Sequence, residues 1–326
     1  MTKKIRKIYN FLNKIIDRLC RRSFSFKMNE GALLYLDDIR LYQPTADAAT
    51  ILQLESVFMG STMKHLSTDL RNLLEKMVIR DEIGVPDFDF KKIESLTASK
   101  GFGLGFIPRI NGSWFKNIHD WGRGMYPGEN LRSETLEDWN DNVWHIEHEG
   151  FTRRWPIRVT YYGWYKRYVA SNSGGSHHAA KVVYQANRDN LTYNRESLVE
   201  YLSINIDSVQ KLECYYFSFI FLARKPYGNN QVMNAETEFR LLLSNLLSNG
   251  VEYLSTNCYR DNITLAFISK EKLDGRKTEF EMWMTTALLA GKIIPLVEYL
   301  KHPETFHTKS YIHEIRDIYI GTPYMN

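Results

Sequence analysis

The chain has 326 residues, of which 44% are hydrophobic and 25% are charged. This is the composition of a folded globular protein and excludes wholesale disorder, and the length predicts two domains, or one domain with large additions. The net charge of +4 permits contact with phosphate or nucleic acid without requiring it. The three cysteines lie far apart, which indicates neither a disulfide framework nor a zinc knuckle.

No segment reads as a membrane span or a secretory signal. The apolar runs are shorter than the ~20 residues that cross a bilayer, and the N-terminus lacks a signal peptide's apolar stretch and cleavage site. Because scattered cysteines also suit a reducing compartment, we expect a cytoplasmic protein.

Residues 1–24 read as a basic amphipathic helix. Lysines and arginines lie between apolar side chains that recur at three- and four-residue steps, at Ile5, Ile8, Leu12, Ile15 and Leu19. The apolar stripe must contact a surface. That surface is either its own domain, a second subunit or protein partner, an anionic membrane surface, or nucleic acid.

A second helix is predicted from Thr62 to about Ile79. One face of it would be apolar, formed by Met63, Leu66, Leu70, Leu73, Leu74 and Met77. Residues 30–100 are therefore expected to be mostly helical. We expect residues 1–100 to form a helical N-terminal region and residues 101–326 to form an α/β region.

The stretch 101–150 has no clean periodicity, and its structure is not predicted. Gly101-Phe-Gly-Leu-Gly105 resembles a cofactor-binding glycine loop only in composition, since no strand and helix flank it; a tight packed turn is the alternative. Near the end of the stretch, His145-Ile-Glu-His-Glu149 gathers imidazoles and carboxylates. If this segment is extended, His145 and Glu147 share one face and are candidate metal ligands, with Glu149 as an alternative carboxylate; a solvated polar strand or turn is the other interpretation.

Two strands and two helices are predicted next. Residues 156–161 alternate like a strand, Gly163 turns the chain, and residues 165–170 form the second strand of a hairpin. Helices are expected at residues 179–187 and 195–202.

The hairpin is rich in cations and tyrosines. Its positive charges are Arg153, Arg154, Arg158, Lys166 and Arg167. On alternating strand positions, some of these would point together, offering cations to phosphates and aromatic rings to bases. We take Arg158 as a candidate phosphate ligand and the other four as candidate nucleic-acid contacts; a solvated hairpin face is the alternative.

The segment Ser171-Asn-Ser-Gly-Gly-Ser-His-His178 lies between a predicted strand and a predicted helix. Glycines there permit a sharp turn, and the start of a helix attracts anions through its N–H groups and its dipole. The candidate phosphate-binding residues are Asn172, Ser173, Gly174, Gly175 and Ser176. His177 and His178 are candidate catalytic residues, as donors to phosphate oxygens or as acid and base. A strand-to-helix turn with surface histidines is the alternative.

This run of elements resembles the core of the ParB/sulfiredoxin superfamily. Trp155-Pro-Ile-Arg-Val159, a turn, a strand, the glycine loop and a helix follow the family's order over about Trp155 to Gln185. The family's loop reads G-E-R-R in the ParB branch and G-G-C-H-R in sulfiredoxin. The resemblance implies a core at about residues 145–212 whose loop holds nucleotide phosphates.

Three positions depart from the family pattern. His178 stands where the family has its phosphate-binding arginine, and Lys181 stands where a small helical residue is usual. Ser176 replaces the sulfiredoxin cysteine, which argues against sulfinic-acid reduction because that chemistry needs a thiolate.

The C-terminal part alternates regularly between strand and helix. Strands are expected at residues 215–223 and 263–269, and helices from Asn234 and from Thr278, which gives a β-α-β-α unit at about 213–300. The predicted fold class is mixed α/β, or α+β, with a helical N-terminal region and a mixed sheet covered by helices.

Two functional hypotheses follow. In the first, the chain binds a nucleoside triphosphate or nucleic acid, with Mg or Mn, and is a hydrolase, phosphotransferase or nuclease. His145, Glu147, His177 and His178 would then hold a metal beside the phosphate if the two segments meet, and Glu147 is the candidate base. In the second, it is a non-enzymatic regulatory subunit of a larger bacterial assembly, such as a defence or toxin system, that docks a partner or nucleic acid through its basic first helix.

Overall fold

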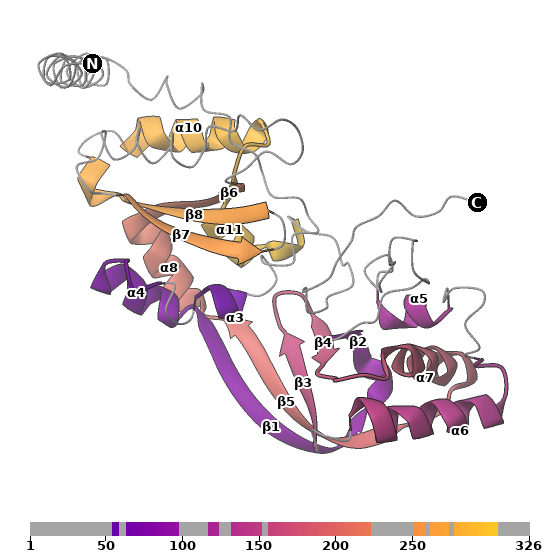
Figure 1. The fold of residues 1–326 in the computed structure, drawn as a ribbon. Coiled ribbons are helices and arrows are strands. Elements are labelled where there is room, and N and C mark those ends of the chain that lie inside the picture. The colour runs from indigo at the N-terminus through magenta and orange to yellow at the C-terminus, as the bar shows by residue number, and fades with distance from the viewer. Residues whose placement is uncertain are drawn as a thin grey trace, which may run out of the picture. The chain divides into compact units, whose positions relative to one another are not determined.

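The computed structural model describes residues 54–58, 63–97, 117–123, 132–151, 156–222, 251–258, 261–273 and 277–305. Within these ranges the fold is α+β, as predicted, with mixed sheets and covering helices (Figure 1). The described residues form two compact units. The five-stranded unit holds those within 54–58, 74–206 and 302–305, and the four-stranded unit holds those within 63–73 and 207–301.

The five-stranded unit is built on a mixed sheet. Its strands are β1 (Val78–Asp89), β2 (Ile93–Leu96), β3 (Ile157–Tyr162), β4 (Arg167–Ala170) and β5 (Asn194–Ile204). They lie in the order β1-β5-β3-β4-β2. The pairs β1–β5 and β3–β4 are antiparallel, whereas β5–β3 and β4–β2 are parallel.

Three helices pack together on this unit. They are α5 (Ile118–Arg123), α6 (Leu136–His145) and α7 (Ser176–Asp189), and α7 contacts both of the others (Figure 1). The α6 helix continues into one turn of π-helix, η5 (Ile146–Gly150). The shorter helical pieces are α3 (Leu54–Val57), η3 (Phe90–Lys92) and η7 (Pro303–Thr305).

The core of the unit lies between the sheet and these helices. Ile157, Val159 and Val199 are buried on the sheet side, and Ala180 and Val183 of α7 belong to the same cluster. Alternation along β3 therefore directs Arg158 toward the opposite face of the sheet.

The predicted hairpin and the helix after it are confirmed. β3 and β4 pair antiparallel, and α7 covers the predicted range 179–187. The helix predicted at 195–202 is wrong, since this segment lies in β5. β5 sits between two strands and buries Val199 on one face and Leu202 on the other, so its apolar residues do not alternate cleanly.

The N-terminal region differs from the prediction where it is described. The helix expected at 62–79 is shorter, as α4 (Thr68–Glu75), and residues 78–96 form β1 and β2 with η3 between them rather than helix. β1 became a strand because it pairs along most of its length with β5. The amphipathic helix predicted at 1–24 and the glycine run 101–105 lie outside the described residues.

The four-stranded unit has an antiparallel sheet. Its strands, in the order β7-β8-β6-β9, are β6 (Tyr216–Leu222), β7 (Val251–Cys258), β8 (Asp261–Ser269) and β9 (Ile294–Pro295). Its other elements are α8 (Ile206–Tyr215), η6 (Glu271–Leu273), α10 (Lys277–Leu289) and α11 (Leu296–Lys301). Figure 1 shows α10 on one side of the sheet and α8 on the other.

An aromatic core joins α10 to its sheet. Phe217, Phe219 and Phe221 of β6 pack with Phe280 and Trp283 of the helix. The predicted strands at 215–223 and 263–269 and the helix from 278 are confirmed as β6, β8 and α10, whereas β7 was not predicted. The helix predicted from Asn234 lies outside the described residues.

The two units do not divide at residue 100 as predicted. Among the described residues, the boundaries fall at Leu73/Leu74 and Ile206/Asp207, so the four-stranded unit takes residues from both sides of the other. None of the helices in the described ranges is long and apolar enough to cross a membrane.

Candidate functional site

The glycine loop connects β4 to α7, as predicted from the sequence. Gly175 is the N-cap of α7 and has a φ of 62°, in the left-handed region that favours glycine. No side chain caps the helix at this end, and its first turn contains no acidic residue. Ser176, His177 and His178 form that turn, where the positive end of the helix dipole lies.

Hydrogen bonds hold the loop in place. The Asn172 side-chain amide donates to the Gly174 carbonyl at 2.8 Å, and the Asn172 N–H donates to Thr97 at 3.2 Å. The Ser173 N–H donates to the carbonyl of Gly150 at 3.1 Å. Asn172 and Ser176 are buried, whereas Ser173 is exposed, so these predicted phosphate-binding residues divide into two that support the loop and one that solvent reaches.

The segment carrying His145 is helical rather than extended. Thr135 and Asp138 form a capping box at the start of α6, which fixes where the helix begins. At the other end, the Phe151 N–H donates to the Ile146 carbonyl at 3.1 Å and closes the π-turn. Residues four apart share a face of a helix, so His145 lies beside Glu149 rather than Glu147.

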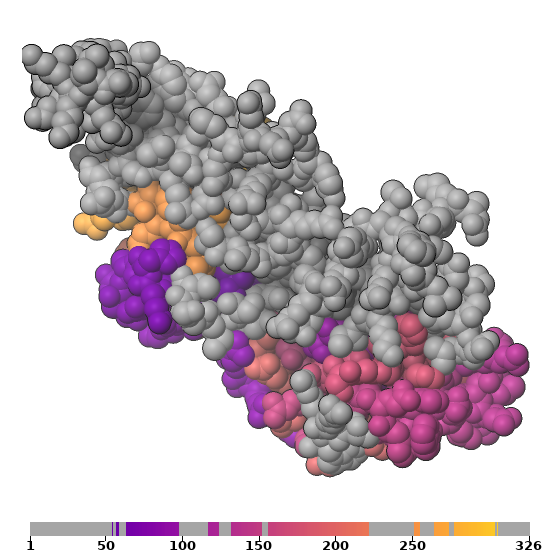
Figure 2. Space-filling model, in the orientation of Figure 1, coloured from indigo at the N-terminus to yellow at the C-terminus, as the bar shows by residue number. Residues whose placement is uncertain are grey.

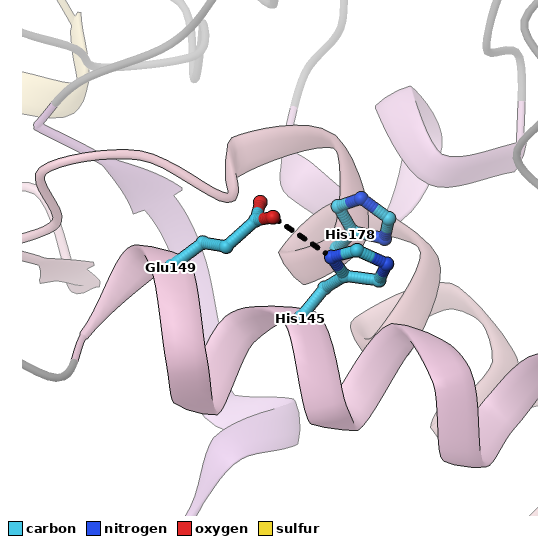
Figure 3. Close-up of side chains that lie close together, drawn as sticks. All are labelled: His145, Glu149 and His178. Atoms are coloured by element: carbon cyan, nitrogen blue, oxygen red, sulfur yellow. Dashed lines mark ion pairs between the residues drawn. The ribbon is translucent and has the colours of Figure 1, made fainter.

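A cluster of three side chains lies between α7 and the α6 helix with its η5 turn (Figure 3). Its members are His145, Glu149 and His178. The His145 Nδ1 lies 3.1 Å from a Glu149 carboxylate oxygen. This is an ion-pair distance without hydrogen-bond geometry, and no described residue hydrogen-bonds this buried nitrogen. The rings of His145 and His178 stack, with centroids 4.1 Å apart and planes 16° apart.

Asn142 orients His178 from one turn before His145. Its side-chain amide donates to the Arg132 carbonyl at 2.8 Å, which leaves its Oδ1 as the acceptor facing the His178 Nδ1 at 2.9 Å. The His178 Nδ1 therefore carries a proton. In the neutral ring the lone pair lies on Nε2, and in the charged ring Nε2 is a second donor. Asn142 is buried and was not predicted as a site residue.

Glu147 belongs to a different set of contacts. Its carboxylate accepts hydrogen bonds from Arg195 at 2.7 Å and from the Tyr193 hydroxyl at 3.0 Å. Burial raises the pKa of the Tyr193 hydroxyl above its usual range, which keeps it a donor. The structure therefore places Glu147 in a supporting ion pair, away from the partnership with His145 that an extended segment would have produced.

His177 faces the other neighbour of α7. Its ring meets Trp121 of α5 edge-on, with centroids 5.5 Å apart. The helices are very close here, since a Cβ on Gly122 would lie 2.1 Å from the Ala180 carbonyl oxygen. Adjacent positions on a helix point about 100° apart, so the two loop histidines contact different elements.

The basic hairpin residues do not gather at the loop. Arg158 is exposed on the sheet face opposite α7, and Lys166 is exposed in the turn. Arg167 was predicted as a nucleic-acid contact, and this is wrong: it is 1% exposed, lies 4.6 Å over the Tyr165 ring and donates to Ser95 at 3.4 Å. Arg153 and Arg154 lie outside the described residues.

A sequence signal for the helical arrangement does exist. Thr135-Leu-Glu-Asp138 has the spacing of a capping box before apolar residues, and that spacing predicts a helix through His145. A helix would have placed Asn142, His145 and Glu149 on one face. The approach of that face to His178 is a tertiary contact that no local pattern encodes.

Part of the chain matches the sequence model of one family. Residues 125–277 match the sequence model of a family of unknown function, DUF6685. The matched range includes all three members of the cluster and the glycine loop. Searches among curated proteins and among solved structures found no match.

Proposed function

We propose that the chain binds the phosphate groups of a nucleotide at the loop Ser173–His178. The observation that carries this proposal is the start of α7. There, Gly175 caps the helix without a side-chain hydrogen bond, and the following turn has two histidines and no carboxylate. Backbone N–H groups at a helix start, together with the helix dipole, favour an anion.

The resemblance to the ParB/sulfiredoxin superfamily supports the same ligand. The described chain runs through strand β3, a turn, strand β4, the glycine loop and helix α7 in the order of that family. In the family this loop holds nucleotide phosphates. The departure at Ser176 argues against thiol chemistry, because no thiolate is present there. At His178, an imidazole stands in place of the family's phosphate-binding arginine.

A nucleoside triphosphate, accompanied by Mg or Mn, is the ligand class we propose. Ser173 is exposed beside the loop, where its hydroxyl donates to the Gly150 carbonyl at 3.3 Å and would have to turn to donate to a phosphate. His178 offers an imidazole in the first turn. Hydrolysis, phosphoryl transfer or nucleic-acid cleavage would be an activity of the same site, with His177 or His178 stabilising charge that develops on the phosphate.

Direct binding measurements test the proposal. ATP, CTP, GTP, NAD and a short single-stranded DNA are titrated into the full chain in EDTA and again with Mg, and each mixture is assayed for turnover. The same titrations use His177→Ala/His178→Ala and, as a matched control, His148→Ala. His148 is exposed, stacks on Trp144 at 4.4 Å and lies outside the loop.

We expect at least one nucleotide to bind, and the double variant to lose about tenfold to a hundredfold in affinity, the worth of one or two charge-assisted hydrogen bonds. His148→Ala should bind as the unaltered chain does. If no nucleotide binds, or if the folded double variant binds equally well, the loop is not a phosphate site, and the regulatory-subunit alternative gains support.

A further inference from the structure

The cluster of His145, Glu149 and His178 has the composition of a metal site. It brings two imidazoles and one carboxylate together from two helices, with one ligand atom of each residue within 4.8 Å of the others. We infer that these residues bind one transition-metal dication of the zinc type. Glu149 is exposed and both histidines are partly exposed, so ions in solution can reach these side chains. Figure 2 shows atoms of the magenta part of the chain, the colour of α6 in Figure 1, at the surface.

One pair of ligand atoms in the cluster already lies near the separation that a metal requires. Ligand atoms around tetrahedral zinc lie about 3.4 Å apart, because each bond is about 2.1 Å long. The His145 Nδ1 and Glu149 oxygen already lie 3.1 Å apart. The stacked rings must tilt to aim both lone pairs at one ion, and His145 and Glu149, with side chains 27% and 52% exposed, have the freedom to move.

Asn142 supplies the supporting contact that metal-binding histidines usually have. Such a histidine donates its second ring N–H to an oxygen acceptor, which fixes the tautomer and the ring orientation. The His178 Nδ1 donates to the Asn142 Oδ1 in this way, which assigns the lone pair of the neutral ring to Nε2. The Arg132 carbonyl holds the Asn142 amide in turn.

The donor atoms favour a transition metal over Mg. Mg prefers an octahedron of oxygen ligands, whereas imidazole nitrogen suits Zn, Fe, Co and Ni. Two imidazoles and one carboxylate form a donor set that is common for zinc with an open fourth position. This position lies beside the first turn of α7, because His178 belongs to that turn.

The metal site does not depend on the proposed function. Metal binding is measured without nucleotide, and the nucleotide titration in EDTA is made without metal, so either can fail alone. If both hold, the open position would accept a water molecule or a phosphate oxygen.

The test uses Zn(II) and Co(II) alone, with the full chain stripped of metal. Glu149→Gln removes the carboxylate charge from the cluster. Glu147→Gln is its matched control, since it makes the same substitution two residues away on a carboxylate bound by Arg195 and Tyr193. His145→Ala is compared with His148→Ala in the same way. Circular dichroism and thermal melting verify that each variant is folded.

We expect one zinc equivalent to bind the unaltered chain, and Glu149→Gln and His145→Ala each to weaken it by tenfold or more. Glu147→Gln and His148→Ala should stay within about twofold. Co(II) should give the visible absorption bands of a four- or five-coordinate site, and these should disappear in His145→Ala. The inference is overturned if Zn(II) does not bind, or if Glu149→Gln and Glu147→Gln bind it with equal affinity.

Discussion

Gly150 and Gly175 touch backbone to backbone: a Cβ atom on Gly175 would lie 3.2 Å from the Cα of Gly150. The contact joins the end of η5 to the start of α7. It therefore holds the glycine loop against the helical segment that carries His145 and Glu149. The same backbone contact therefore positions both the glycine loop and the His145–Glu149–His178 cluster. It joins residues 145–150 to residues 173–178, which are separate segments of the sequence.

Replacing Gly175 should destabilise the fold. Gly175→Ala places a side chain on a left-handed backbone, which costs about 1–2 kcal/mol, and presses on Gly150. Gly84→Ala is the control, since a Cβ there meets nothing within 4 Å. Urea unfolding should show a lower unfolding free energy for Gly175→Ala only. Equal stability of the two variants would mean that the loop is not held as described.

A negative charge at Ser173 should block phosphate without unfolding the protein. Ser173→Asp adds a carboxylate at an exposed position beside the start of α7, where the helix dipole tolerates it. Ser173→Asn has nearly the same shape without the charge. Calorimetric titration with nucleotide should show a tenfold or greater loss for Ser173→Asp relative to Ser173→Asn. If the two variants bind alike, phosphate does not approach this side of the loop.

Removing the Asn142 amide should weaken zinc binding as well as stability. Asn142→Ala leaves the His178 N–H without its acceptor, and such supporting contacts are worth about tenfold to a hundredfold in metal affinity. Gln185→Ala is the matched control, because Gln185 is also a buried amide and donates to the Thr135 carbonyl at 2.7 Å.

Both variants should lose about 1–3 kcal/mol of unfolding free energy through an unpaired buried group. Only Asn142→Ala should lose zinc affinity. The supporting role of Asn142 would be refuted by equal zinc affinities in the two folded variants.

The start of α6 should make stability depend on pH. Hydrogen bonds from the backbone N–H groups of Thr135 and Glu134 lower the pKa of Asp138 below its usual value near 3.8. A carboxylate with a lowered folded-state pKa stabilises the fold above the unfolded pKa, and this stabilisation is lost as the pH falls through the folded value.

The unfolding free energy of the unaltered chain should therefore fall more steeply below about pH 4 than that of Asp138→Asn, measured by urea unfolding at a series of pH values. Parallel curves for the two proteins would show that the Asp138 carboxylate is not held by these N–H groups.

The hairpin and the helix after it were predictable from the sequence. The alternation in β3 reflects a buried Ile157 and Val159 beside an exposed Arg158, and the small residues at the start of α7 suit its close packing against α5 and α6. β5 was mistaken for a helix because Val199 and Leu202 are buried on opposite faces, which removes the two-residue period.

The candidate site was predictable only in part. The loop histidines and His145 were identified by residue type, and the structure brings His145 and His178 together. The carboxylate partner was misplaced by two residues because an extended backbone pairs positions two apart, whereas a helix pairs positions four apart. Arg167 was assigned to the surface because the local sequence does not distinguish a buried arginine that packs on a tyrosine from an exposed arginine.

The most direct test of phosphate binding at the loop is a nucleotide titration of the isotope-labelled chain, followed through its backbone amide NMR signals. The amides of Gly174, Gly175, Ser176, His177 and His178 should show the largest shifts, and inorganic triphosphate should move the same signals. Shifts confined to other parts of the chain, with these amides unmoved at saturation, would contradict the account.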